Sequence, residues 1–362
     1  MSDQSPAVAK FPETQSPPRS ELWYTRCPVP TTSGIAQHFQ WLHRAFAEKG
    51  IALKSIRASD DLAVRNSHFD HTHPNMFREG GNVPPIWARA NGRDTAVVGI
   101  TWVDEEQVIL VRGDSDIHNP AQLKGRKLGV PRHATRLVDV ARAQDLRGLL
   151  TALKLAGVSR NDAFFIDIDG PDFDLREPTN RRDRVHGPSA ALLAGEVDAI
   201  YAKGAVGATL IAKHGFRPIL DINKQADPQL RVNAGTPRPI TVDRSLALKH
   251  PELVARYLAV LIHTAHWATT HPAEVVAAIA AETNADVSAV ARGFGPTLHT
   301  QFAPSLSNQY LSGLASQKAF LLDEGFLAAD FDFDEWVVAE PLALAGEFSK
   351  TLASPIDFAR AA

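Results

Sequence analysis

The sequence is poor in sulfur: its 362 residues include a single cysteine, Cys27, and two methionines. One cysteine cannot form an internal disulfide, so the chain carries no mark of an oxidising compartment. No apolar run approaches the roughly 20 residues needed to cross a bilayer, and we expect no contact with a membrane. The net charge of −3 provides no broad basic surface, which disfavours a nucleic-acid partner.

Several common motifs are also missing. The chain has no internal repeat and neither of the glycine-rich phosphate-binding patterns, GxGxxG or GxxxxGK[ST]. Residues 1–20, MSDQSPAVAKFPETQSPPRS, are rich in proline and serine and lack the apolar core of an export signal. We therefore predict a disordered leader over 1–20 and a cytoplasmic location.

Apolar residues make up 44% of the chain, and its length suits about two domains. Short β-rich runs alternate with helical patterns, which predicts an α/β fold with mainly parallel, doubly wound sheets. The expected strands lie at 22–25, 51–56, 95–102, 107–112, 164–168, 197–201, 218–220 and 239–242. The expected helices lie at 35–49, at 137–156 in two pieces, and at 189–194, 252–270, 272–282 and 307–322. Residues 60–81 are polar and are predicted to form a long functional loop.

Cys27 stands where the first expected strand ends and Pro28 and Pro30 stop it from continuing. A lone cysteine is most often a small buried hydrophobe. Here the neighbouring Arg26 and the flanking prolines favour a polar, accessible setting in which a thiolate is useful. The junction between a strand and the following helix is also where α/β folds bind ligands.

A second polar cluster, formed by His68, Asp70, His71 and His73, raises the question of a metal. The stretch lacks the helical HExxH arrangement, and the chain has no paired cysteines. We therefore expect no metal and interpret His71 and His73 as pocket or loop residues.

Three stretches resemble the type II periplasmic-binding-protein fold, and one of them, the helical C-terminus, is similar to the return of its chain to the first lobe. Residues 116–130, DIHNPAQLKGRKLGV, are similar to its passage from first to second lobe, and 190–201, AALLAGEVDAIY, to a helix–glycine–strand unit of its second lobe. The resemblance implies two lobes with an active site in the cleft between them. We expect lobe 1 at 21–115 and 236–362, and lobe 2 at 116–235.

A narrower resemblance covers about residues 22–344 and concerns the 2'-hydroxybiphenyl-2-sulfinate desulfinase family. The residues that carry it are Cys27-Pro28-Val29-Pro30, His68-Phe69, Arg78, Gly80-Gly81, Pro84-Pro85, Gly99-Ile100-Thr101 and Gly293-Phe294-Gly295. The family implies an essential cysteine at Cys27, an arginine and glycine that hold the sulfinate at Arg78 and Gly81, and a supporting histidine at His68.

This resemblance predicts a hydrolase that cleaves a carbon–sulfur bond of a sulfinate without a cofactor. A guanidinium can bind both sulfinate oxygens. The glycine pair lets backbone N–H groups approach the sulfinate as well, because no Cβ stands in the way. Gly80, Pro28 and Phe69 complete the predicted substrate site. Cys27 would act as proton donor or as nucleophile, and we favour the proton donor because the ring carbon needs a nearby acid.

Departures from the family affect the expected substrate. Gln144-Asp145 and Ala202-Lys203-Gly204 stand where the family has aromatic residues, which favours a smaller or more polar sulfinate than a biphenyl. The main alternative is a solute-binding protein for a sulfonate or related anion, feeding an ABC importer without catalysis. A second alternative, an enzyme acting on a heterocycle, has no supporting residue cluster. We expect a monomer.

Overall fold

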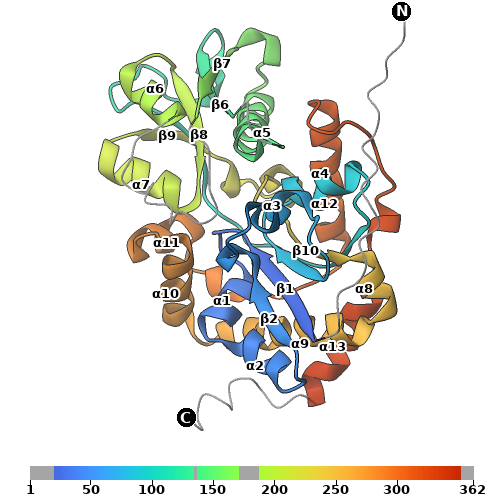
Figure 1. The fold of residues 1–362 in the computed structure, drawn as a ribbon. Coiled ribbons are helices and arrows are strands. Elements are labelled where there is room, and N and C mark those ends of the chain that lie inside the picture. Colours follow the sequence, from blue (N-terminus) through green and yellow to red (C-terminus); the bar gives the residue numbers. More distant parts are fainter. Residues whose placement is uncertain (1–19, 134–136, 171–186, 352–362) are drawn as a thin grey trace, which may run out of the picture.

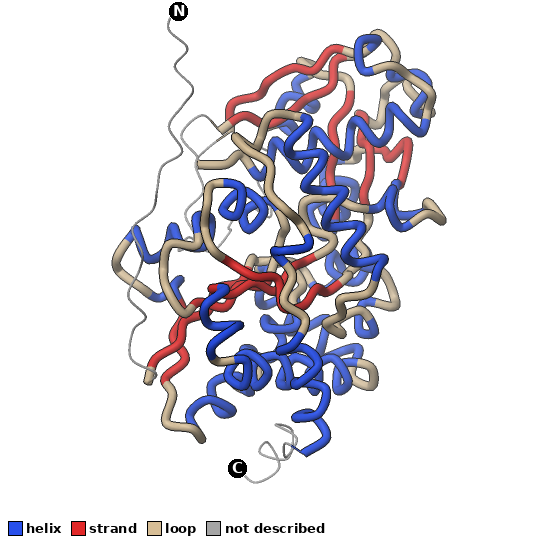
Figure 2. Tube along the Cα trace, turned by 90° about the vertical axis from the view of Figure 1, so that its right-hand side faces the viewer, coloured by secondary structure: helices blue, strands red, loops and turns tan. Residues whose placement is uncertain are grey.

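The computed structural model describes residues 20–133, 137–170 and 187–351, so the predicted leader lies outside the described residues apart from Ser20. Within these ranges the strands form two five-stranded mixed sheets, one in each of two lobes (Figure 1). The view turned by 90° shows one sheet in the upper part of the molecule and the other below it, with helices beside each (Figure 2).

The first sheet has the strand order β2-β1-β3-β10-β4. Its strands are β1 (Glu21–Arg26), β2 (Ala52–Ser55), β3 (Met76–Glu79), β4 (Thr95–Thr101) and β10 (Arg238–Asp243). β1 pairs in parallel with β2 and β3, with Thr25 opposite Arg78, whereas β10 is antiparallel to β3 and β4. The carboxyl ends of β1 and β3 therefore meet at one edge.

The second sheet has the order β7-β6-β8-β5-β9. Its strands are β5 (Gln107–Val111), β6 (Lys127–Arg132), β7 (Phe164–Asp169), β8 (Ala199–Lys203) and β9 (Arg217–Asp221). β5 is antiparallel to β8 and β9. Both sheets are thus mixed rather than mainly parallel, because β5 and β10 follow the two crossings between lobes and enter their sheets in the reverse direction.

The pairing of β5 also bears on the expected lobe division. The sequence places residues 107–115 in the first lobe, but β5 lies within the second sheet, so the chain changes sheet between β4 and β5. The remaining boundaries of the two lobes stay predictions.

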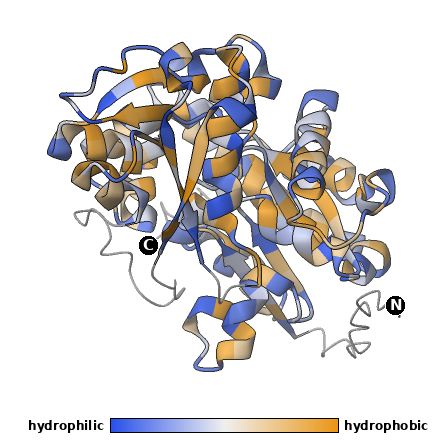
Figure 3. Cartoon of the chain, turned by 90° about the horizontal axis from the view of Figure 1, so that it is seen from above, coloured by the Kyte–Doolittle hydropathy of each residue, from blue (hydrophilic) through white to orange (hydrophobic). Residues whose placement is uncertain are grey.

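Helices cover both faces of each sheet. In the first lobe they are α1 (Thr32–His38), α2 (Trp41–Ala47), α3 (Leu62–Asp70), α4 (Val83–Ala90), α8 (Arg244–Lys249), α9 (Pro251–Ala268), α10 (Pro272–Thr283), α11 (Val287–Phe294), α12 (Asn308–Asp323) and α13 (Glu340–Thr351). In the second lobe they are α5 (Val140–Leu155), α6 (Pro188–Ala194) and α7 (Gly204–His214). Apolar segments gather on the strands and on the helix faces turned toward them (Figure 3).

The lobes also touch through α7 and α11. A Cβ on Gly293 would lie 2.2 Å from the backbone carbon of Gly204, so the close approach of the two backbones requires glycine there. The Glu106 N–H donates to the carbonyl of Gly293 (2.7 Å), and the Gly204 N–H donates to the carbonyl of Glu106 (2.8 Å). These contacts connect the first crossing segment to both lobes.

Three predicted elements were wrong in detail. The helix expected at 35–49 is two helices, because Gln40 adopts a left-handed backbone (φ 61°) between α1 and α2. The loop expected at 60–81 contains α3, which begins at the N-cap Asp61 and ends at a left-handed His71, and then β3. The helix expected in two pieces at 137–156 is one continuous helix, α5.

The long polar stretch at 60–81 gave little helical signal because its apolar residues are few. Arg65, Ser67 and His68 are buried on α3 by tertiary contacts rather than by their own hydrophobicity. In the described part of the chain, no helix has both the length and the apolar content to span a membrane.

Candidate active site

Cys27 directly follows β1 at the edge where the carboxyl ends of the parallel strands meet. Its backbone N–H donates to the carbonyl of Glu79, the last residue of β3 (3.2 Å). Its side chain is partly exposed. The cysteine is therefore held in place at a strand end and is not sealed in a core.

His68 lies on α3 and faces the thiol. Its Nε2 is 3.3 Å from Cys27 Sγ, and its Nδ1 is 2.8 Å from the hydroxyl oxygen of Thr25. Burial lowers the pKa of His68 well below its usual value, and the Arg78 guanidinium lowers this pKa further. The imidazole is therefore uncharged at neutral pH, with one ring nitrogen as donor and the other as acceptor.

Arg78 lies in β3, beside β1, and is fully buried. Its Nη2 donates to Cys27 Sγ (3.4 Å), its Nε to the carbonyl of His68 (3.0 Å) and its Nη1 to the carbonyl of Gly81 (2.9 Å). Burial lowers the pKa of Arg78 and the adjacent Cys27 raises it, but a guanidinium stays charged. Among the described residues no carboxylate pairs with this cation, so the site favours negative charge on sulfur or on a ligand.

Two glycines, Gly80 and Gly81, allow the close packing around Cys27 and Arg78. A Cβ on Gly80 would lie 2.4 Å from Cys27 Sγ, and the residue has φ +152°, which favours glycine. A Cβ on Gly81 would lie 2.7 Å from the carbonyl oxygen of Ala234, on the returning crossing segment. Gly80 thus makes room for the thiol, and Gly81 brings the crossing segment close to Arg78.

Of the seven predicted site residues, the structure brings five into one cluster: Cys27, His68, Arg78, Gly80 and Gly81. Phe69 stands next to this cluster, with its ring edge-on to the His68 ring at 4.9 Å between centroids. Pro28 is partly exposed beside Cys27, and its connection to the cluster is through the chain itself.

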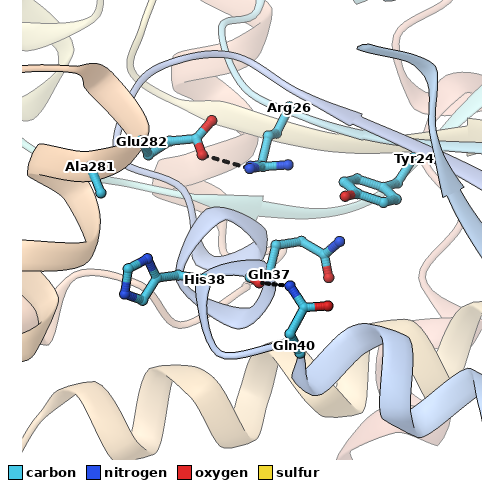
Figure 4. A pocket seen from close by; sticks show the side chains of 7 residues that line it. All are labelled: Tyr24, Arg26, Gln37, His38, Gln40, Ala281 and Glu282. Carbon is cyan, nitrogen blue, oxygen red and sulfur yellow. Dashed lines mark hydrogen bonds and ion pairs between the residues drawn. The ribbon is translucent and has the colours of Figure 1, made fainter. Parts of the chain in front are cut away.

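Arg26, which was expected to contribute to a polar setting for the thiol, does not face it. Successive residues of a strand point to opposite faces, so Arg26 points away from the Thr25 and Cys27 side. Its Nη2 pairs with Glu282 (2.6 Å) in a cavity of about 290 Å³ that Tyr24 and Gln37 also line (Figure 4). The cation beside the thiol is Arg78, from the neighbouring strand.

The histidines of the 68–73 stretch point to different partners. The Nε2 of His71 is 3.2 Å from the hydroxyl of Thr241, and the ring of His73 packs edge-on against Trp23. Neither ring contacts Cys27 in the hydrogen bonds and ring contacts of the described residues. Within those residues there is no group of three or more His, Cys, Asp or Glu side chains arranged to hold a metal ion.

The two segments that were expected to shape the substrate pocket are largely buried. Lys203 Nζ lies 2.6 Å from Glu105 Oε1, and its side chain is 11% exposed, so its charge is already paired beside the crossing segment. Asp145 is buried on α5 and accepts a hydrogen bond from Gln144 (3.1 Å). Burial raises the pKa of Asp145 to about 7.

The raised pKa of Asp145 predicts a dependence of stability on pH. Its unfolded pKa is about 3.9. Between about pH 4 and pH 7 the folded state binds the extra proton, so stability falls as pH rises through this window, by about 4 kcal/mol at most. Asp145→Asn should remove this loss. The free energy of unfolding, measured with urea at pH 5 and pH 8, tests this prediction. An equal decrease between the two pH values in the variant and in the parent protein would contradict it.

Two residues of the cluster were missed by sequence reasoning. Thr25 bonds the far side of the His68 ring, and Glu79 holds the backbone of Cys27. The signal for Thr25 was available, because residues two apart in a strand share a face and Thr25 precedes Cys27 by two. Glu79 gave no such signal, since its contact depends on the pairing of β1 with β3.

Comparisons with known proteins agree with this geometry. No protein-family model matches the chain. The 2'-hydroxybiphenyl-2-sulfinate desulfinases of Rhodococcus erythropolis and Rhodococcus qingshengii are 28% identical to it, covering 91% of this chain and 94% of each relative. The chain is a homologue of these desulfinases. Because a match over 91% of the chain cannot be confined to one lobe, the homology includes both.

Solved structures support the same relationship. The desulfurization enzyme DSZB matches at 27% identity with a TM-score of 0.72, covering 91% of this chain and 99% of that one. A cysteine-to-serine mutant of DSZB in complex with biphenyl-2-sulfinic acid matches with a TM-score of 0.71. The predicted kinship with the desulfinases is confirmed.

More distant structures share only the fold. The periplasmic aliphatic sulphonate binding protein SsuA of Escherichia coli is 17% identical with a TM-score of 0.62, over 88% of this chain and 92% of that one. A sulfonate-binding SsuA of Methylobacillus flagellatus KT is 14% identical with a TM-score of 0.68, over 91% and 94%. The predicted α/β, periplasmic-binding-protein-like fold is therefore confirmed for this desulfinase homologue.

Proposed function

We propose that the protein is a desulfinase that cleaves the carbon–sulfur bond of an aryl or related sulfinate and releases sulfite. The observation that carries the proposal is a partly exposed cysteine, Cys27, whose Sγ lies 3.3 Å from His68 Nε2 and 3.4 Å from Arg78 Nη2. The homology to 2'-hydroxybiphenyl-2-sulfinate desulfinases over 91% of the chain gives this cluster its chemical context.

The reaction is R–SO2⁻ + H2O → R–H + HSO3⁻. The C–S bond breaks, the carbon gains a proton, and sulfur keeps its two oxygens and gains a third from water. In the proposal Cys27 delivers the proton to carbon, and the reaction class is hydrolysis of a carbon–sulfur bond. Attack of the thiolate on sulfur is the other route open to the same atom.

The neighbours of Cys27 suit proton delivery. With hydrogen on Nδ1, the neutral His68 donates to Thr25 and its Nε2 accepts from the thiol; with hydrogen on Nε2, it donates to a thiolate. The Arg78 cation stabilises the thiolate that remains after the proton has left. These three side chains therefore support both protonation states of the sulfur during a turnover.

The sulfinate is proposed to bind against the same cation. Arg78 uses three of its five N–H donors on His68, Gly81 and Cys27, which leaves two for sulfinate oxygens. The backbone N–H of Gly81 is the proposed third donor, with Gly80, Pro28 and Phe69 around the substrate. We further propose a cytoplasmic monomer and a sulfinate substrate that is smaller or more polar than a biphenyl.

The direct test is sulfite release from biphenyl-2-sulfinate and from benzenesulfinate, measured with the purified protein. A desulfinase releases stoichiometric sulfite and the desulfinated arene. A sulfonate-binding protein, the alternative, would bind methanesulfonate or the sulfinate without releasing sulfite. The stronger identity to the desulfinases than to the sulfonate-binding proteins favours catalysis.

Thr25→Val is expected to lower kcat about tenfold. The substitution keeps the shape of the side chain but leaves the buried Nδ1 of His68 without a partner, at a cost of roughly 1–3 kcal/mol. Thr25→Ser keeps the hydroxyl and should retain activity within about threefold. Initial rates of sulfite release at saturating benzenesulfinate measure both variants, and equal rates for valine and serine would argue against a role for this hydrogen bond.

A further inference from the structure

Glu79 is a fully buried carboxylate at the end of β3, immediately after Arg78. Its Oε2 accepts from the backbone N–H of Ser33 (2.7 Å), and its Oε1 accepts from the backbone N–H of Thr32 (3.1 Å) and the hydroxyl of Thr101 (3.2 Å). Both carboxylate oxygens thus bind the first turn of α1, and Oε1 also binds β4. Such a carboxylate is stabilised by the N-terminal end of a helix.

The same residue also holds the other end of the cysteine loop. Its backbone carbonyl accepts from the N–H of Cys27 (3.2 Å). The loop from Cys27 to Thr31 includes Pro28 and Pro30, which have no N–H to donate, so the loop has few backbone tethers of its own. Glu79 therefore fixes the loop where it leaves β1 and again where α1 begins.

The surroundings provide the positive charge that a buried carboxylate needs. Arg238 is 0% exposed and lies opposite Thr101 in the pairing of β10 with β4. Burial lowers the pKa of Arg238, while Glu105 and Glu79 raise it, so the guanidinium and Glu79 act on each other across this face of the sheet. Glu79 is thus one of a group of buried polar side chains that includes Thr101 and Arg238.

We infer that Glu79 is a positioning residue for Cys27: its carbonyl and its carboxylate together fix the Cys27–Thr31 loop so that the thiol lies between His68 and Arg78. A displacement of about 1 Å in a reacting group can cost about 10²-fold in rate. The role of Glu79 in catalysis rests on the proposed function, but its role in placing the thiol does not.

Glu79→Gln tests the inference, because an amide offers only one acceptor oxygen to the two N–H groups of α1. We expect kcat for sulfite release from benzenesulfinate to fall about 100-fold with KM within about threefold. Cys27 is the only cysteine, so alkylation by iodoacetamide reports on this thiol alone. We expect the alkylation rate to rise at least fivefold as the loop releases the thiol.

Thr101→Val is the matched control, since it removes one of the three hydrogen bonds to the carboxylate and leaves both α1 contacts. It should change kcat and alkylation by less than threefold. If Glu79→Gln does not fold, Glu79→Asp tests the inference instead. The shorter side chain keeps the negative charge but moves the carboxylate away from the N–H groups of α1. For this variant we expect about a tenfold lower kcat and faster alkylation.

An alkylation rate within twofold of the parent protein in the folded variant overturns the inference, even if kcat falls, because the thiol would then not have moved. Absence of sulfite release from the parent protein would instead refute the proposed function. In that case the alkylation rates alone still test the positioning role of Glu79.

Discussion

Cys27→Ser is expected to lower kcat for sulfite release by about 10²- to 10⁴-fold, the range typical of a lost general acid. A serine hydroxyl is a much weaker acid than a thiol and a poorer nucleophile, so the substitution disables either role proposed for Cys27. The smaller oxygen still fits beside His68 and Arg78, so sulfinate binding should persist. Sulfite release at saturating benzenesulfinate measures the loss.

The same variant separates the two functional classes. Isothermal titration with biphenyl-2-sulfinate should give a Kd for Cys27→Ser within about tenfold of the KM of the parent protein. A sulfonate-binding protein would bind equally well with cysteine or serine and release no sulfite in either form. Unchanged turnover in Cys27→Ser would remove the thiol from the proposed mechanism.

Gly80→Ala is expected to have the second-largest effect, lowering kcat about 100-fold or more. The new Cβ would lie 2.4 Å from Cys27 Sγ and 2.8 Å from Cys27 Cβ, so the thiol must move away from its partners. A displacement of about 1 Å is enough to account for this loss. Rates of sulfite release, together with Cys27 alkylation by iodoacetamide, measure the effect.

Gly92→Ala is the matched control for backbone strain. Gly92 also has a positive φ (+83°), but nothing lies within 4 Å of a Cβ built there. It should therefore lose stability, by roughly 1–2 kcal/mol, and keep its activity. If folded Gly80→Ala kept full activity, as Gly92→Ala is expected to do, the close fit of Gly80 against the thiol would not matter for catalysis.

The alternation of strands and helices predicted the α/β class, and most strand positions could be read from local pattern. Local pattern failed where tertiary contacts decide the conformation. α3 is short and polar, and its buried face consists of Arg65, Ser67 and His68, which no hydrophobic periodicity reveals. Likewise, the break between α1 and α2 falls at a glutamine, Gln40, and not at a proline or glycine that the sequence would reveal.

The candidate site shows the same division. Resemblance to the desulfinase family predicted Cys27, His68 and Arg78 as catalytic residues, and the structure places His68 and Arg78 in contact with Cys27. Their individual roles remain proposals. Thr25 shares the face of Cys27 through the two-residue period of a strand, so local reasoning could have found it. Glu79 could not have been found in this way, because its partners Thr32 and Thr101 are distant in sequence.

The sequence by itself determined which chemical groups are available: one thiol, prolines that end its strand, and glycines small enough to approach it. The tertiary structure alone decided which cation stands beside that thiol. Arg26 is covalently next to it but points to the opposite face of β1, whereas Arg78 reaches it from β3, 51 residues away. The physical reason is that side-chain direction follows from the local strand period, but the identity of a neighbouring strand depends on pairing between distant segments.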